Sequence, residues 1–259
     1  MKLTVFASGS TGNCALVQGG GRSVLIDAGI SARRIRAGLA RAGLLPSDLD
    51  GVFVTHEHAD HIKGLATLLK YDPVTVYAPG TVRGAIHRAI PGADVYTREL
   101  VPERALELGT LTVTAFPTPH DTPQSVGYRL EAADGCLGFA TDTGCVTDTM
   151  LRYLAGAQIA LIEANHDVAM LKNGPYPPHL QKRILSDRGH LSNAECTFLA
   201  SVLAQTGTRR IVIGHLSKEN NLPGLALRTV QRGVEGTEAS VSVAPELGFL
   251  EVESAPCCV

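Results

Sequence analysis

One stretch of the chain, directly after the apolar run 51–54, reads Thr55-His56-Glu57-His58-Ala59-Asp60-His61. It brings three imidazoles and two carboxylates into seven residues. Both groups are common ligands of zinc, manganese and iron in proteins. A solvated polar loop explains this density less well, because unpaired ionisable groups crowded beside a buried strand repel one another. The stretch therefore predicts a metal site at the end of a strand.

The spacing of these histidines indicates the local geometry. His56 and His58 are two positions apart, so they can converge from an extended or loop segment but would point apart on a helix. The zinc-protease pattern His-Glu-x-x-His instead needs two histidines four positions apart on a helix. The stretch therefore predicts ligands that lie on a loop.

Composition restricts the class of protein. The chain has 259 residues, 44% of them hydrophobic, with 27 glycines, which is typical of a globular α/β protein. The formal net charge of -2 argues against a globally basic nucleic-acid binder. Any contact with a polyanion must therefore come from a local basic patch.

We expect a cytoplasmic protein with no membrane partner. No apolar run approaches the length of a membrane span, and the run 3–7 is too short for a secretory signal. The six cysteines include no Cys-x-x-Cys pair, which favours reduced thiols. Cys257 and Cys258 lie in an apparent tail, and the sequence predicts no role for them.

Short apolar or alternating runs bounded by glycine, proline or aspartate recur along the chain and predict strands. Ser31 and Gly43 delimit one predicted helix, and Ser192 with Glu195 forms a capping box before another. No linker or repeat divides the chain, so we predict one domain over 1–259 with a disordered tail at about 254–259. Two sheets with helices outside are the economical architecture. The predicted strands are 3–7, 14–18, 23–26, 51–54, 74–77, 111–116, 125–130, 136–140, 159–162, 210–213, 240–243 and 249–252, and the predicted helices 32–42, 61–71, 81–89, 147–154, 196–205 and 222–232.

Several predicted strands lead to a residue that can bind metal. His120, Asp142 and His215 each follow such a run, and Asp27 follows another. A lone histidine is more often a hydrogen-bonded structural group than a ligand. Ligands from the ends of different strands can gather along one edge of a sheet, where α/β proteins commonly place their clefts. Together with the stretch 55–61, these residues indicate a single site.

On these residues the chain resembles the metallo-β-lactamase superfamily, whose signature is His-x-His-x-Asp-His followed by a histidine, an aspartate and a final histidine after strands. The resemblance covers nearly the full length. It implies an α/β fold, namely an αβ/βα four-layer sandwich of two mixed sheets with outer helices, and two divalent metal ions, zinc or manganese. The implied ligands are His56, His58 and His120 for one ion, Asp60, His61 and His215 for the other, and Asp142 as the bridge.

Asp27 resembles the second-strand aspartate of that family, which supports the ligand loop. A turn aspartate that ends a strand is the competing explanation.

Finer motifs resemble those of the WalJ/YycJ group of DNA exonucleases within this superfamily. Two positions depart from the group's pattern: Ala164 stands in place of Ser, and Gln181 in place of Lys. Neither is an implied ligand, so the departures concern substrate contacts rather than chemistry. The motifs lie at 8–13 (SGSTGN), 163–167 (EANHD), 176–177 (YP), 189–193 (GHLSN) and 215–221 (HLSKENN).

The resemblance implies phosphodiester hydrolysis by a hydroxide that two metal ions activate. In this interpretation Asp60 orients the hydroxide, His190 is the general acid and Glu163 aligns His190. A capping or supporting histidine is the competing explanation for His190.

Candidate substrate contacts lie in the same motifs. The loop 8–13 could offer amides and hydroxyls to a phosphate, or be a plain hairpin turn. The basic residues Lys172, Lys182, Arg183, Arg188 and Lys218 could form the local basic patch or a solvated helix face. The ring of Tyr176 could stack on a base or pack in its own loop. His87 lies in a predicted surface helix, and we expect no catalytic role for it. The candidate contacts are Ser8, Ser10, Asn13, His166, Tyr176, Lys182, Arg183, Lys218 and Asn220.

The leading interpretation is a metal-dependent nuclease, with 5′ to 3′ exonuclease action on double-stranded DNA as the resemblance implies. A tRNase Z-like endoribonuclease would share the metal ligands, but no long exosite insertion is visible in the sequence. A thioester or other small-ester hydrolase is a further alternative. A metal-stabilised regulatory protein without turnover is the alternative from another class. The sequence does not predict the oligomeric state.

Overall fold

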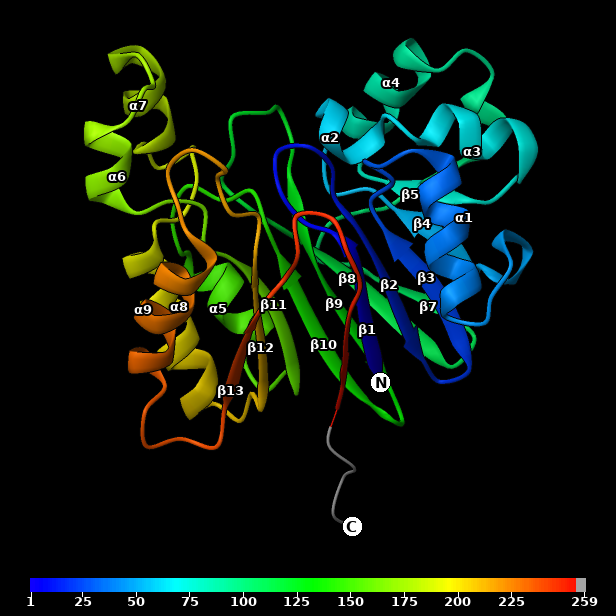
Figure 1. Ribbon diagram of the computed structural model, residues 1–259. Helices are drawn as coiled ribbons and strands as arrows, with labels where there is room; N and C mark the ends of the chain where they lie inside the picture. Colours follow the sequence, from blue (N-terminus) through cyan, green and yellow to red (C-terminus); the bar gives the residue numbers. More distant parts are fainter. Residues whose placement is uncertain (255–259) are drawn as a thin grey trace.

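Two mixed β-sheets lie face to face in the middle of the molecule, and helices cover their outer faces (Figure 1). The computed structural model describes residues 1–254. Within them, the first sheet has the order β14 (Leu250–Glu253), β1 (Lys2–Ala7), β2 (Cys14–Gly19), β3 (Arg22–Ile26), β4 (Gly51–Phe53), β5 (Val76–Ala78) and β6 (Thr97–Glu99). The second has the order β13 (Ser240–Val243), β12 (Arg210–Gly214), β11 (Ile159–Glu163), β10 (Gly135–Ala140), β9 (Val126–Ala132), β8 (Leu111–Pro117) and β7 (Ala105–Leu108).

Each sheet has an antiparallel part and a parallel part. Strands β14, β1, β2 and β3 pair antiparallel, and β3 to β6 pair parallel. In the second sheet β7 to β10 pair antiparallel, and β10 to β13 pair parallel. Because parallel strands end at the same edge, the residues that follow β3, β4, β10, β11 and β12 come together at the edges of the two sheets.

Helices lie outside both sheets. On the side of the first sheet are α1 (Ala32–Arg41), α2 (Ala59–Ile62), α3 (Leu65–Tyr71) and α4 (Gly80–Ala89), with the short 3₁₀ helices η1 (Pro46–Asp48) and η2 (Ala93–Val95). On the side of the second are α5 (Asp148–Leu154), α8 (Asn193–Gln205) and α9 (Pro223–Gly233). Helices α6 (Val168–Asn173) and α7 (Pro178–Ile184) project beyond this sheet at the upper left of Figure 1.

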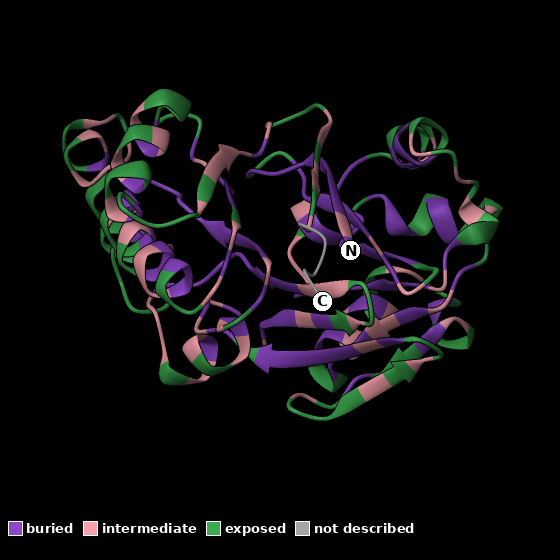
Figure 2. Cartoon of the chain, turned by 90° about the horizontal axis from the view of Figure 1, so that it is seen from below, coloured by how far each residue is buried: buried purple, intermediate pink, exposed green. Residues whose placement is uncertain are grey.

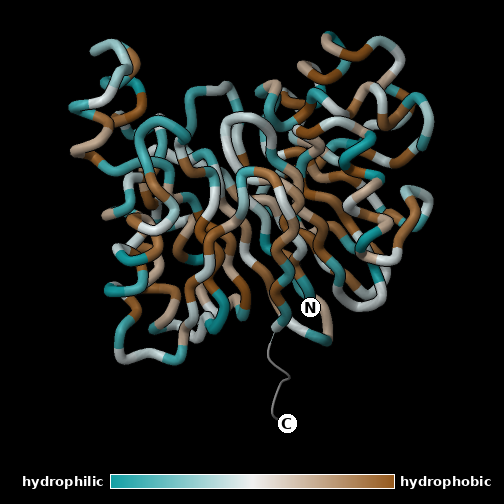
Figure 3. Tube along the Cα trace, in the orientation of Figure 1, coloured by the Kyte–Doolittle hydropathy of each residue, from teal (hydrophilic) through white to brown (hydrophobic). Residues whose placement is uncertain are grey.

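Three hydrophobic clusters hold these layers together, as the buried strands of Figure 2 and the apolar centre of Figure 3 show. Side chains alternate along a strand, so Leu16 packs under α1 with Ile35, while the next residue, Val17, packs between the sheets with Tyr128. The third cluster lies between the second sheet and α5, α8 and α9. These clusters establish the predicted four-layer α/β sandwich.

Most predicted elements are confirmed within one to three residues, but the structure corrects two sets. Strands β6 and β7 and helices α6 and α7 were not predicted. The predicted helix 61–71 is split into α2 and α3 at Gly64. A Cβ atom at Gly64 would lie 1.9 Å from the Ile30 carbonyl oxygen, so this tight contact explains the glycine. The Gly64 amide donates to the Ala28 carbonyl at 2.9 Å instead of along the helix, which accompanies the break.

The two ends of the described chain meet beside β1. The Ser254 amide donates to the Met1 carbonyl at 2.9 Å, and the amino terminus donates to Ser254 Oγ at 2.9 Å. The rest of the predicted tail, 255–259 with Cys257 and Cys258, lies outside the described residues. Between residues 1 and 254, every helix is too short or too polar to cross a membrane.

Tyr128 links the core to the predicted metal loop. Its hydroxyl is fully buried and donates to the Val54 carbonyl at 2.6 Å, immediately before Thr55. We predict that Tyr128→Phe lowers the free energy of unfolding by about 1–3 kcal/mol, because it leaves a buried carbonyl unpaired. Urea denaturation measures this loss. Tyr153→Phe is the control, since the Tyr153 hydroxyl makes no hydrogen bond within residues 1–254; equal losses in both variants would contradict the prediction.

Candidate metal centre

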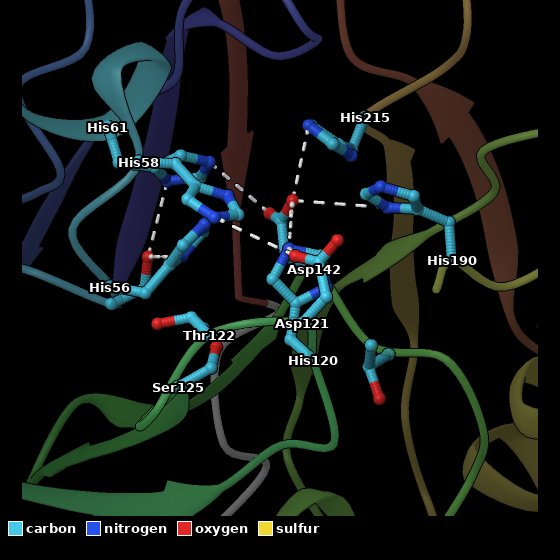
Figure 4. A network of polar contacts seen from close by, with 12 residues as sticks. His56, His58, His61, His120, Asp121, Thr122, Ser125, Asp142, His190 and His215 are labelled. Atoms are coloured by element: carbon cyan, nitrogen blue, oxygen red, sulfur yellow. Dashed lines mark hydrogen bonds and ion pairs between the residues drawn. The ribbon is translucent and has the colours of Figure 1, made fainter. Parts of the chain in front are cut away.

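The residues of the candidate site follow strand ends at one edge of the two sheets, and Figure 4 shows most of their side chains. The loop after β4 carries residues 56–61. In the second sheet His120 follows β8, Asp142 follows β10, Glu163 ends β11 and His215 follows β12. The structure therefore brings together side chains from both sheets that are up to 159 positions apart in the chain (His56 to His215).

Backbone strain is concentrated at this edge. Asp27, Asp142 and His215 have φ angles of 61°, 55° and 55°. The left-handed region is unfavourable for residues other than glycine and is maintained only where surrounding contacts enforce it. One such contact is the hydrogen bond from the His215 amide to Ser8 Oγ, at 2.8 Å. The packed sheets thus hold these turns in the conformation that the site requires.

One cluster of possible ligands consists of His56, His58 and His120, whose ligand atoms lie within 4.8 Å of one another. Their ring centroids are 4.6 to 5.2 Å apart. A second cluster consists of Asp60, His61 and His215. The two clusters correspond to the two implied ligand sets.

Asp142 lies between the two clusters (Figure 4). One carboxylate oxygen is 3.4 Å from His61 Nε2, and the other is 3.4 Å from His215 Nε2 and 3.8 Å from His120 Nε2. These positions allow one carboxylate to contact ions on both sides.

The orientation of the imidazoles suits a metal ion. Nδ1 of His56, His61, His120 and His215 each lies 2.7–3.1 Å from an oxygen, which leaves Nε2 directed into the site. Such a contact on one ring nitrogen is the usual arrangement around metal-bound histidines.

Unsatisfied polar atoms support the same conclusion. His56 Nε2, His215 Nε2 and Asp142 Oδ2 are buried and have no hydrogen-bond partner among the residues that the structure describes. An unpaired buried polar atom costs about 1–3 kcal/mol, and divalent cations would satisfy all three. The residues present therefore fit divalent metal binding.

Asp27 supports the ligand loop through hydrogen bonds to Thr55 and His61. Its fully buried carboxylate accepts hydrogen bonds from the Thr55 amide and from His61 Nδ1, both at 2.8 Å. Burial alone would lower the pKa of His61, but the nearby carboxylates of Asp27 and Asp142 outweigh it and raise that pKa to about 9. These bonds favour the supporting role over that of a simple turn residue.

Glu163 in the second sheet is, like Asp27 in the first, a buried carboxylate that binds histidines of the site. Its buried carboxylate accepts from His190 Nδ1 at 2.8 Å, from His215 Nδ1 at 2.7 Å and from the Thr143 amide at 3.0 Å. Burial would raise the pKa of Glu163, but His190 and His215 hold it far below its ordinary value. Burial would also lower the pKa of His190, and Glu163 reverses this and raises it. Glu163 thereby holds the Nδ1 side of the His190 ring.

The predicted substrate contacts differ in their surroundings. Ser8 and Asn13 are buried and bonded within the site, Asn13 Nδ2 lying 3.0 Å from His61 Nε2. His166 is buried, and neither of its ring nitrogens is paired among residues 1–254. Asn220 is also buried, and its backbone carbonyl accepts a hydrogen bond from the Asp167 amide. Ser10, Lys182 and Lys218 are exposed, and Tyr176 is half-buried.

Two of the predicted basic-patch residues are engaged by the protein itself. Arg183 pairs with Asp121, and Arg188 donates to the His120 and Thr122 carbonyls, both at 2.8 Å. These arginines tie α7 and the following loop to the segment that carries His120. Two of the five basic residues therefore already have partners within the described part of the chain.

Sequence reasoning did not identify Thr55 and Asp121 as site residues. Thr55 Oγ1 contacts Asp27, His56 and His61, and its position at the start of the histidine stretch was an available signal. Asp121 faces the first cluster directly. Its place next to His120 could have indicated this, but only the turn after β8 determines which way it points.

Comparison with known proteins places the chain in a class. The family model described as Beta-lactamase superfamily domain matches residues 22–216. The crystal structure of the metallo-β-lactamase fold protein YhfI from Bacillus subtilis has a TM-score of 0.73, with 17% identity and coverage of 97% of this chain and 98% of that chain. The chain belongs to the metallo-β-lactamase superfamily.

Two relatives define the group more closely. Exodeoxyribonuclease WalJ from Streptococcus pneumoniae serotype 2 (strain D39 / NCTC 7466) is 34% identical over 247 residues, covering 93% of this chain and 91% of that protein. Exodeoxyribonuclease YycJ from Bacillus anthracis is 34% identical over 248 residues, covering 95% and 94%. Within the superfamily, the chain belongs to the WalJ/YycJ group.

The support from Asp27 is testable through metal affinity. Asp27→Asn retains the size and tolerates the left-handed φ, but it loses the negative charge that orients His61. We predict that it weakens divalent metal binding by roughly 10- to 100-fold, measured by competition with a chromophoric chelator. Asp50→Asn, which alters a carboxylate bonded to Arg22 away from the site, is the control. Unchanged affinity in Asp27→Asn would contradict the supporting role.

Proposed function

We propose that this protein is a metal-dependent exodeoxyribonuclease that degrades double-stranded DNA from a 5′ end with two divalent ions, zinc or manganese. The observation that carries the proposal is the complete set of ligand groups from both sheets with the Glu163–His190 pair beside it. The two exodeoxyribonuclease relatives, which match almost the whole chain, support DNA as the substrate.

The residues divide the chemistry between them. Bound divalent ions would lower the pKa of water and polarise a phosphoryl oxygen. Asp60 lies within 3.6–3.8 Å of the Nε2 atoms of His61 and His215. Burial would raise the pKa of Asp60, but these two histidines hold it below its ordinary value. Asp60 therefore stays ionised and can accept a hydrogen bond from the attacking water.

His190 is the proposed general acid. Its side chain is 21% exposed, so its Nε2 can reach a substrate while Nδ1 donates to Glu163. When the P–O3′ bond breaks, the 5′-terminal nucleotide leaves through its 3′-oxygen and the phosphate stays on the remaining strand. A 3′-alkoxide is a poor leaving group until it receives a proton. Glu163 raises the pKa of His190, which favours the protonated form, and the proton passes to that oxygen.

We propose that the protein acts in the cytoplasm. Its described cysteines, Cys14, Cys136, Cys145 and Cys196, form no disulfide, which suits a reducing compartment.

The proposed contacts to the DNA backbone are Lys182 and Lys218, which are both exposed.

Digestion of end-labelled DNA tests the substrate. We predict that the protein with zinc or manganese releases label from the 5′ end of linear duplex DNA, and faster than from single-stranded DNA, precursor tRNA or a thioester. The matched control is Asp60→Ala, which removes one proposed ligand and should abolish release. Equal release by the control, preferred cleavage of RNA, or hydrolysis of the thioester alone would each reject the DNA exonuclease.

A substrate with a good leaving group tests His190. We predict that His190→Ala lowers turnover of DNA by roughly 10²- to 10⁴-fold, but has little effect on the p-nitrophenyl ester of thymidine 5′-monophosphate, since nitrophenolate departs without a proton. In the wild type, DNA turnover should fall as pH rises through the raised pKa of His190, because the acid form is lost.

The control for this variant is His87→Ala. His87 lies on α4 and contacts Thr97 Oγ1 at 2.6 Å. The His87→Ala variant should therefore hydrolyse both DNA and the nitrophenyl ester at the wild-type rate. An equal loss on DNA and on the nitrophenyl ester in His190→Ala would indicate a structural histidine instead of a proton donor.

A further inference from the structure

Asp121 presents a carboxylate oxygen to the first histidine cluster. It directly follows His120, and its Oδ1 lies 3.3 Å from His120 Nε2 and 3.6 Å from His58 Nε2 (Figure 4). This oxygen is buried and has no hydrogen-bond partner among the described residues. It therefore faces the two nitrogens that would bind a metal and is not used by any other group.

The distances match those between neighbouring ligands of one ion. Two donor atoms that are each about 2.1 Å from a metal lie about 3.0 Å apart at a right angle and about 3.4 Å apart at a tetrahedral angle. Asp121 Oδ1 stands at nearly this separation from His120 Nε2 and slightly beyond it from His58 Nε2. Asp142 Oδ1 lies farther from His120, at 3.8 Å. Asp121 is thus at least as well placed for this ion as the implied bridge.

The other oxygen of Asp121 is held from outside the site. Arg183, on α7, directs both Nε and Nη2 at Oδ2. Arg188 fixes the backbone on either side of Asp121 through the carbonyls of His120 and Thr122. Carboxylates that bind metal are usually hydrogen-bonded in this way, which orients the free oxygen.

We propose that Asp121 is an additional ligand of the metal held by His56, His58 and His120, and that Arg183 positions it. The inference rests on the proposed metal centre but not on the substrate. With Asp142, this ion receives five protein donors, more than the four of a tetrahedral zinc site. Such a set suits a six-coordinate ion such as Mn²⁺ with one position left for water or substrate.

Metal titration of the apoprotein tests the proposal without any substrate. Free Mn²⁺ is followed by electron paramagnetic resonance, and Zn²⁺ by chelator competition. Asp121→Asn is expected to weaken Mn²⁺ binding by roughly 100-fold, and Zn²⁺ binding by less than about tenfold. The visible spectrum of the Co²⁺ form is expected to become more intense in Asp121→Asn, because the ion loses a ligand.

Two further variants separate a ligand from a mere negative charge. Asp121→Glu retains the charge but displaces the oxygen, so the changed Co²⁺ spectrum is expected to remain. Arg183→Gln is expected to weaken Mn²⁺ binding by roughly tenfold. The matched control is Arg152→Gln, which breaks an exposed ion pair with Glu103 and should leave affinity unchanged.

The outcomes are distinguishable. A wild type that binds no divalent metal would refute the metal centre and with it this ligand. A wild type that binds metal, with the same affinity and Co²⁺ spectrum in Asp121→Asn, would refute Asp121 alone. Full recovery of affinity in Asp121→Glu with wild-type spectra in every variant would reduce Asp121 to an electrostatic neighbour.

Discussion

The hydrogen bonds that the buried Asp27 carboxylate accepts from Thr55 and His61 are the constraint on which the metal centre depends. A carboxylate without solvent exposure is costly unless it is paired and hydrogen-bonded. Asp27 meets this condition only when the loop after β4 takes its observed path. Glu163 imposes the same condition on the other sheet through His190 and His215. Each sheet therefore contributes one buried carboxylate that orients histidines, and the site lies between them.

The rigid layers make this arrangement possible. One apolar cluster packs the two sheets against each other, and the other two pack the outer helices onto the sheets. Strand ends that are far apart in sequence therefore meet with little freedom. The strained turns at Asp142 and His215 persist because packed strands precede them. Helix α7 and the loop after it then attach to the same centre through Arg183 and Arg188. The candidate ligand His120 and helix α7 are thus held together by direct contacts.

Local pattern was sufficient for elements with strong apolar periodicity. The capping box of Ser192 and Glu195 begins α8 as predicted, and Gly43 ends α1. Ser31 begins α1, although its side chain makes no capping bond. The missed elements are short: β6 has two exposed residues of three, and α6 and α7 lie around a Gly-Pro turn. Such segments are stabilised by tertiary contacts, so their own sequence carries little signal.

The sequence by itself determined the metal-binding chemistry, because the spacing of residues 56–61 holds several ligand types within one covalent loop. The resemblance to family motifs then indicated the distant candidate ligands His120, Asp142 and His215. Only the tertiary structure decided which oxygen or nitrogen of each side chain faces the site. Asp27 became a support, Arg183 a partner of Asp121, and Asp121 a neighbour of His58 through the turn that follows β8. The physical reason is that side-chain direction depends on sheet packing and turn geometry, which no local run of residues encodes.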